Sequence, residues 1–67
     1  MMKYRIRELR KRSGMTQDEL SKRSGISRAT IWKLETREGE ITTTGTLVKI
    51  ADALCVPVDE LFLSSRV

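Results

Sequence analysis

The sequence predicts a compact all-α domain of five short helices, and three observations support this fold class. Apolar residues recur at intervals of three and four along the 67-residue chain, as they do on the buried face of an amphipathic helix. No segment alternates apolar and polar residues in the way that a half-buried strand does. Glycines and helix-capping residues divide the chain into short segments. A chain of this length forms a single domain, residues 1–67, with a small aliphatic core.

The first two predicted helices have well-defined ends. The first covers about residues 3–13 and stops at Gly14, because glycine readily adopts the left-handed conformation that ends helices. The second begins at Thr16 and stops before Gly25. Thr16 and Glu19 have the spacing of a capping box, in which each side chain accepts a hydrogen bond from the backbone N–H of the other residue.

The remaining helices follow from similar signals. Ser27 is a favourable N-cap for a third helix over about residues 28–36. The second and third helices, joined by a short turn around a glycine, form a helix-turn-helix unit over about residues 16–36. A fourth helix with one apolar face covers about residues 44–54. A short fifth helix follows Pro57, whose ring fixes φ at a helical value.

Charge and cysteine content restrict the function. Residues 1–33 contain ten Lys and Arg but three Asp and Glu, a net charge of +7, whereas residues 34–67 carry −3. This asymmetry is typical of a domain that binds a polyanion, although basic residues also simply solvate helix faces. The chain has no His and no Gly-rich phosphate loop after a strand, so we expect no enzyme. Cys55 is the single cysteine, which excludes an internal disulfide, and we interpret it as a buried structural thiol.

No segment suggests export or a membrane location. The chain has no apolar run of the roughly 20 residues that a bilayer-spanning helix needs. Its basic N-terminal segment lacks the apolar stretch of a secretory signal. We therefore expect a cytoplasmic protein, and nothing in the sequence implies a cofactor, a metal or a small-molecule ligand.

The third helix presents two different faces. With about 100° per residue, Ile31 and Leu34 fall on the inward face and Trp32 falls on the opposite side. The outward residues, which we predict to contact DNA bases, are Arg28, Ala29, Trp32 and Lys33. Arg and Lys donate to guanine, and a small residue permits close approach and contact with a thymine methyl group. The alternative is that Trp32 folds sideways and covers the connection at residues 37–42.

Helix termini and basic side chains supply candidate phosphate contacts. Unpaired N–H groups at the start of the second helix form an anion site, to which Gln17 adds its amide. Thr43 occupies the equivalent place at the start of the fourth helix. The complete predicted set is Gln17, Ser27, Thr43, Arg12 and Lys22, with Arg10 as a further candidate. The basic members are also compatible with a purely solvent-exposed role.

The segment "IRELRKRSGMTQDELSKRSGISRATIWKLE", followed by "TLVKIADAL" and "VDELF", resembles the phage-repressor (Cro/Xre-type) helix-turn-helix family. The resemblance covers about residues 5–63. It implies a five-helix, lambda-repressor-like domain that binds duplex DNA, generally as a homodimer on a two-fold related operator, with the third helix in the major groove.

The resemblance also implies roles for individual residues. It places the base-contacting positions on Arg28, Ala29 and Lys33, with Trp32 beside them, and the phosphate-clamping glutamine on Gln17. It further implies a structural ion pair between Arg10 of the first helix and Glu35 at the end of the third.

The chain departs from the family pattern at several positions. Ser21 stands where alanine is usual, so we expect its hydroxyl to form a local hydrogen bond. Thr36 and Arg37 replace the usual Asn-Gly, and Cys55 replaces the glycine that commonly follows the fourth helix.

We therefore predict a sequence-specific, double-stranded DNA-binding transcriptional regulator, specifically a repressor, that acts as a homodimer. The predicted dimer contacts are Val58, Phe62 and Leu63. Two other hypotheses remain open. One is an antitoxin or adaptor whose main partner is another protein, bound through the acidic half of the chain (Glu38, Glu40, Asp52, Asp59 and Glu60). The other is a helical interaction module that binds no nucleic acid.

Overall fold

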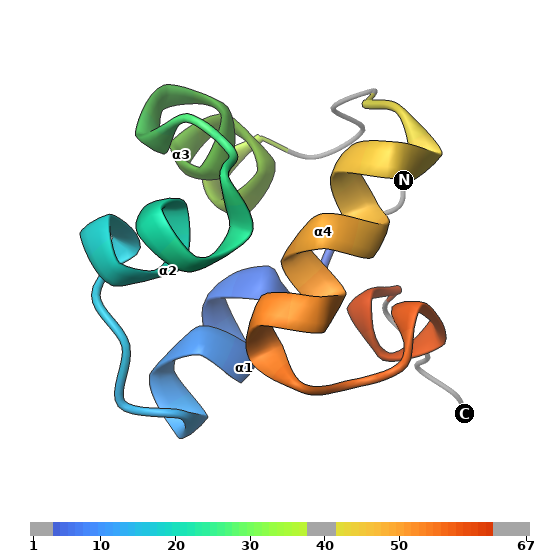
Figure 1. Cartoon of the computed structure of the whole chain (residues 1–67), viewed down its shortest axis with the longest axis horizontal. Coiled ribbons are helices and arrows are strands. Elements are labelled where there is room, and N and C mark those ends of the chain that lie inside the picture. The colour runs from blue at the N-terminus through green and yellow to red at the C-terminus, as the bar shows by residue number, and fades with distance from the viewer. Residues whose placement is uncertain (1–3, 38–41, 63–67) are drawn as a thin grey trace.

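The structure, a computed structural model, describes residues 4–37 and 42–62 and shows the predicted compact, all-helical architecture. Its elements are α1 (Ile6–Arg12), α2 (Gln17–Ser24), α3 (Arg28–Thr36), α4 (Thr44–Leu54) and a 3-10 helix, η1 (Val58–Leu61). Helix α2 packs against both α3 and α4, and α4 packs against η1 (Figure 1). Helix α3 lies at the edge of the molecule, which leaves one of its faces open to solvent.

Aliphatic side chains from all five elements form the core of the described residues. The buried apolar residues are Ile6, Leu9, Met15, Leu20, Ile31, Leu34, Leu47, Ile50, Ala51, Leu54 and Leu61. The four from α4 form the apolar face predicted for that helix. Trp32 is not among them, so the largest side chain of the protein lies outside its core.

The predicted capping box of α2 and the predicted glycine stops after α1 and α2 are confirmed. The Glu19 N–H donates to Thr16 Oγ1 and the Thr16 N–H donates to Glu19 Oε1, both at 3.0 Å, which completes the capping box. Gly14 and Gly25 have φ values of 72° and 76°. Both glycines therefore end the preceding helix in the left-handed conformation. The ends of α3 and α4 also agree with the predicted ranges.

Helix α1 is shorter than the predicted range of residues 3–13, because the segment before it pairs with the other end of the chain. Tyr4 forms an isolated antiparallel bridge with Phe62, and the two rings lie with their centroids 5.8 Å apart. The Arg5 N–H donates to the Leu61 carbonyl at 2.7 Å. This pairing holds the chain in a non-helical conformation up to Arg5, so the helix begins at Ile6.

The prediction of five α-helices is wrong at the last element, which is a single 3-10 turn. The Glu60 N–H donates to the Pro57 carbonyl, and the Phe62 N–H donates to the Asp59 carbonyl, both in the i to i+3 pattern. Phe62 must be extended to pair with Tyr4, and Leu61 must point into the core. These two constraints leave no room for a second helical turn.

The interpretation of Cys55 as a buried thiol is also wrong, since its side chain is exposed. Cys55 follows Leu54, the last core position of α4, and has φ 60° and ψ 40°. Its N–H donates to the Asp52 carbonyl, and the Val56 N–H donates to the Ala51 carbonyl. This pattern is a Schellman motif, which usually has glycine at the left-handed position.

Candidate nucleic-acid interface

The outward face of α3 is the centre of the candidate interface. Ile31 and Leu34 are completely buried, whereas Trp32 retains 49% of its surface. The other outward residues, Arg28, Ala29 and Lys33, are also exposed. The predicted orientation of the helix is therefore confirmed, and its open side combines two cations, one small residue and one large aromatic ring.

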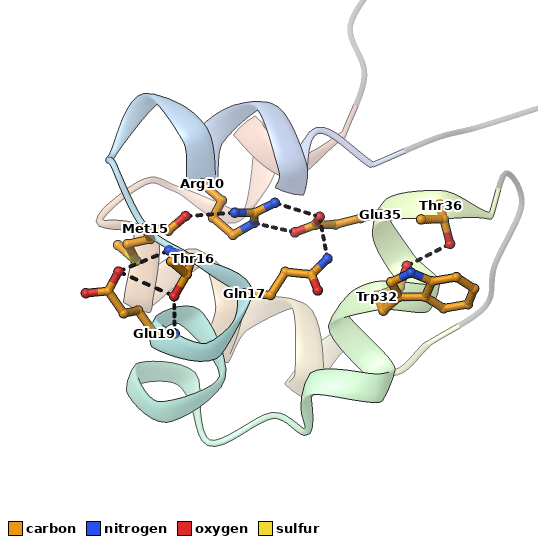
Figure 2. Close-up of polar contacts among 8 residues, drawn as sticks. All are labelled: Arg10, Met15, Thr16, Gln17, Glu19, Trp32, Glu35 and Thr36. Atoms are coloured by element: carbon orange, nitrogen blue, oxygen red, sulfur yellow. Dashed lines mark hydrogen bonds and ion pairs between the residues drawn. The ribbon is translucent and has the colours of Figure 1, made fainter.

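Trp32 lies on the side of α3 away from the buried polar contacts. The Thr36 hydroxyl donates to the Trp32 carbonyl at 2.8 Å, and Figure 2 shows the indole directed away from the Glu35 carboxylate. The alternative in which Trp32 covers the connection depends on residues 38–41, which lie outside the described residues.

The turn between α2 and α3 is fixed by two serines. The Ser21 hydroxyl donates to the Ile26 carbonyl at 2.7 Å, which is the local hydrogen bond expected for this departure from alanine. The Ile26 N–H donates to Ser24 Oγ at 3.1 Å. Because both backbone polar groups of Ile26 are engaged, the direction in which α3 leaves the turn is tightly constrained.

The predicted ion pair between Arg10 and Glu35 is present and buried. Arg10 Nε donates to Glu35 Oε2 at 2.7 Å, and Arg10 Nη2 donates to Glu35 Oε1 at 3.1 Å (Figure 2). The third guanidinium nitrogen, Nη1, donates to the Met15 carbonyl at 2.7 Å. Arg10 thus joins α1, the start of α2 and the end of α3, and its role is structural.

Gln17 is the first residue of α2 and is half-buried. Its amide Nε2 donates to Glu35 Oε1 at 3.0 Å. The sequence did not predict this contact, because it depends on how closely α2 and α3 pack. A glutamine at the first position of a helix is compatible with a phosphate contact, but the sequence does not show which protein group its side-chain amide contacts.

Ser27 and Thr43 act as N-caps of α3 and α4. The Thr30 N–H donates to Ser27 Oγ and the Thr46 N–H donates to Thr43 Oγ1, both at 3.2 Å. Both capping residues are exposed at helix N-termini, where the remaining backbone N–H groups favour an anion.

The basic candidates on α1 and α2 form exposed ion pairs within their own helices. Arg12 Nη2 lies 2.9 Å from Glu8 Oε2, and Lys22 Nζ lies 3.8 Å from Asp18 Oδ2. Exposed pairs of this kind contribute little to stability. Both cations can therefore exchange their carboxylate partner for a phosphate at small cost.

Arg5 connects α1 to η1 in a way that the sequence did not suggest. Its guanidinium donates to both carboxylate oxygens of Glu8 at 3.3 Å and to Glu60 Oε1 at 3.4 Å. The hydrogen bond from Arg5 is the main reason that the pKa of Glu8 lies below its ordinary value. The same bond raises the pKa of Arg5.

The family model described as "Helix-turn-helix" matches residues 6–61, which is most of the chain. The chain belongs to the Cro/Xre-type helix-turn-helix family. This is a family of DNA-binding regulators, so the predicted class, a sequence-specific DNA-binding regulator, is confirmed at the level of the family.

Two relatives of this helix-turn-helix protein agree with the assignment. An uncharacterized HTH-type transcriptional regulator of Archaeoglobus fulgidus is 41% identical over 63 residues, which cover 92% of this chain and 87% of the relative. The crystal structure of the restriction-modification controller protein C.AhdI from Aeromonas hydrophila matches with a TM-score of 0.79 and 34% identity. That match covers 87% of this chain and 86% of the controller protein.

The predicted dimer contacts are only partly within the described residues. Val58 and Phe62 are half-buried and pack against the core of the helix-turn-helix protein, and Leu63 lies outside the described residues. Of the acidic residues considered for a protein partner, Glu60 pairs with Arg5, and Glu38 and Glu40 lie outside the described residues. In the part of the chain that the structure describes, no helix is long and apolar enough to cross a bilayer.

Proposed function

We propose that this helix-turn-helix protein is a transcriptional repressor that inserts α3 into the major groove of a double-stranded operator. The exposed face of α3 carries the proposal, because Arg28 and Lys33 stand beside an aromatic ring that the core does not use. Arg28, Ala29, Trp32 and Lys33 are the proposed base contacts. Gln17, Ser27, Thr43, Arg12 and Lys22 are the proposed phosphate contacts.

The different roles proposed for the base contacts and the phosphate contacts follow from their chemistry. Arg28 lies in the first turn of α3 and is exposed, which suits donation to the O6 and N7 acceptors of guanine. The phosphate contacts come from helix N-termini and from side chains with local partners, and such contacts set orientation without reading sequence. The caps and the serine-held turn keep the two groups in a fixed relation.

A homodimer is part of the proposal. Two copies related by a two-fold axis place their α3 helices about 34 Å apart, one turn of DNA, and so read two half-sites. Val58, Phe62 and Leu63 are the proposed contacts. The cytoplasm, where the operator DNA of a bacterium or archaeon lies, is the proposed location. The proposal assigns no enzymatic activity, since the family and fold are those of DNA-binding regulators.

Intrinsic fluorescence tests the proposal directly, because Trp32 is the single tryptophan of the chain and lies on the proposed contact face. Titration with random duplex at low salt is expected to change the emission, and the affinity is expected to fall steeply as salt rises. Selection from a random duplex library is then expected to yield a two-fold related sequence. An unchanged emission at low salt together with no enriched sequence would contradict the proposal.

Sedimentation of the protein with the selected duplex tests the dimer separately. Two protein chains on each duplex are expected. One chain per duplex would contradict the dimer and leave the DNA-binding function intact.

A further inference from the structure

The carboxylate of Glu35 is the meeting point of two separate contacts. Oε1 accepts from Arg10 Nη2 at 3.1 Å and from Gln17 Nε2 at 3.0 Å, while Oε2 accepts from Arg10 Nε at 2.7 Å (Figure 2). Glu35 is only 2% exposed. A fully buried acceptor therefore holds the amide of a half-buried residue at the edge of the proposed phosphate site.

This hydrogen bond restricts how Gln17 presents its amide. The planar NH2 group of glutamine has two N–H donors, of which one is directed at Glu35. The second donor lies in the same amide plane, so the hydrogen bond to Glu35 restricts the directions in which it can point. A long side chain that is held before binding loses less conformational freedom when a ligand arrives.

We propose that Glu35 is a positioning residue for DNA binding: its buried carboxylate orients the Gln17 amide so that the second N–H donates to an operator phosphate. This inference rests on the proposed function. Arg10 is required in the arrangement because its guanidinium neutralises a carboxylate that would otherwise repel the phosphate. Arg10 Nη1 also holds the Met15 carbonyl, two residues before Gln17, so the backbone at the start of α2 is fixed as well.

The arrangement links phosphate binding to base reading. Glu35 belongs to the last turn of α3, whereas Gln17 is the first residue of α2. One carboxylate therefore sets the position of the phosphate contact relative to the helix proposed to enter the major groove.

A double-mutant cycle in a background without the ion pair tests this inference. Arg10→Met combined with Glu35→Gln keeps an acceptor oxygen for Gln17, whereas Arg10→Met combined with Glu35→Met removes it. Both backgrounds lose the charges and the Met15 contact equally, and apolar replacement of a buried ion pair is usually tolerated. Gln17→Ala is then introduced into each background, and DNA affinity is measured at a temperature at which circular dichroism shows all variants to be folded.

We expect the loss of DNA affinity caused by Gln17→Ala to depend on the residue at position 35. In the unaltered protein and in the Glu35→Gln background, the affinity should fall about tenfold, the effect of one hydrogen bond to a charged group. In the Glu35→Met background, the loss should be less than about twofold. Lys22→Ala is the matched control, since Lys22 contacts Asp18 and not Glu35, and its loss should be equal in both backgrounds.

The dynamics of the Gln17 side-chain amide in the DNA-free protein provide a second measurement. Its NMR order parameter should be high in the unaltered protein and in the Glu35→Gln background, and low in the Glu35→Met background. A purely structural role for Glu35 would instead give equal losses from Gln17→Ala in both backgrounds, which would overturn this inference alone. Failure of the unaltered protein to bind any duplex would overturn the proposed function and this inference with it.

Discussion

At the residue scale, the side chains of α3 divide sharply between packing and surface chemistry. Ile31 and Leu34 have no exposed surface, whereas Trp32 keeps about half of its own. Trp32 lies outside the core and beside exposed cations, a position that is compatible with the base-contacting role proposed for it. Arg28 and Gln17 differ in their proposed contributions, because Arg28 is proposed to contact base edges and Gln17 is proposed to contact a phosphate.

Arg28→Ala is expected to relax base preference at one operator position, with a loss of about 1–3 kcal/mol of discrimination there. Gln17→Ala is expected to weaken all sequences alike, because phosphates are the same at every position. Competition binding with single-base operator variants measures both effects. Equal losses for both variants across the whole panel would contradict the assigned roles.

Cys55 offers a test of backbone strain at a single residue. It has a positive φ of 60°, which is unfavourable for a residue with a Cβ. Cys55→Gly is expected to raise the free energy of unfolding by about 1 kcal/mol. Gly25→Ala is the converse control: φ is 76° and an added Cβ would contact nothing within 4 Å, so the expected loss of about 1 kcal/mol comes from the backbone alone. Thermal unfolding followed by circular dichroism compares the two variants. A melting temperature of Cys55→Gly below that of the unaltered protein would contradict the inference that the backbone at Cys55 is strained.

At the element scale, each of the three helices of the proposed interface begins at an N-cap formed by local hydrogen bonds. Thr16, Ser27 and Thr43 each accept a hydrogen bond from the backbone N–H three residues later. These contacts involve only neighbouring residues, which is why the starts of α2, α3 and α4 were predictable. The caps also leave other N–H groups unpaired at the helix ends, and these groups favour an anion.

Thr16→Ala is expected to lower the free energy of unfolding by about 1 kcal/mol, because the Glu19 N–H loses its acceptor. Glu19→Gln is the matched control, since glutamine also completes a capping box. Urea unfolding of both variants gives the comparison. A Thr16→Ala midpoint equal to that of the unaltered protein would show that the cap contributes nothing.

At the scale of the whole molecule, long-range polar contacts hold the helices in place. Arg10 and Glu35 join α1 to α3, and Arg5 joins α1 to η1 through Glu60. Tyr4 and Phe62 bring the two ends of the described chain together. Each of these contacts joins residues at least 25 positions apart, so local sequence patterns do not predict it.

Removal of one partner of the buried Arg10–Glu35 pair is expected to lower the free energy of unfolding strongly. Arg10→Met leaves the Glu35 carboxylate buried without its cation, and the expected loss is about 3–5 kcal/mol, comparable with the total stability of a domain of this size. Arg10→Met combined with Glu35→Met should restore most of that loss, because no uncompensated charge remains. Guanidinium unfolding of four proteins, namely the unaltered protein, Arg10→Met, Glu35→Met and the double variant, measures this pattern. A loss in the double variant equal to the sum of the two single losses would contradict the prediction.

The contact between Arg5 and Glu8 makes stability depend on pH. The pKa of Glu8 is lower in the folded protein than its ordinary value of 4.5, chiefly through the hydrogen bond from Arg5. Its contribution is therefore present above that ordinary value and is lost as the pH falls through the folded-state pKa. The difference in stability between the unaltered protein and Glu8→Gln should be largest at neutral pH and disappear in acid. A stability difference that stays constant from neutral to acid pH would contradict this role of the Arg5–Glu8 contact.

The sequence by itself determined the helix boundaries set by caps and glycines, the buried face of α4 and the outward direction of Trp32. All of these depend on helical periodicity or on hydrogen bonds between residues at most four apart. The family resemblance supplied the pairing of Arg10 with Glu35, which periodicity alone does not give.

Only the tertiary structure decided the late start of α1, the reduction of the fifth helix to a 3-10 turn and the exposure of Cys55. It also decided that Gln17 is held by Glu35. The first two follow from the pairing of Tyr4 with Phe62, and the last follows from the packing of α2 against α3. Such contacts join residues far apart in the chain, and their free energy overrides the local preference of each segment.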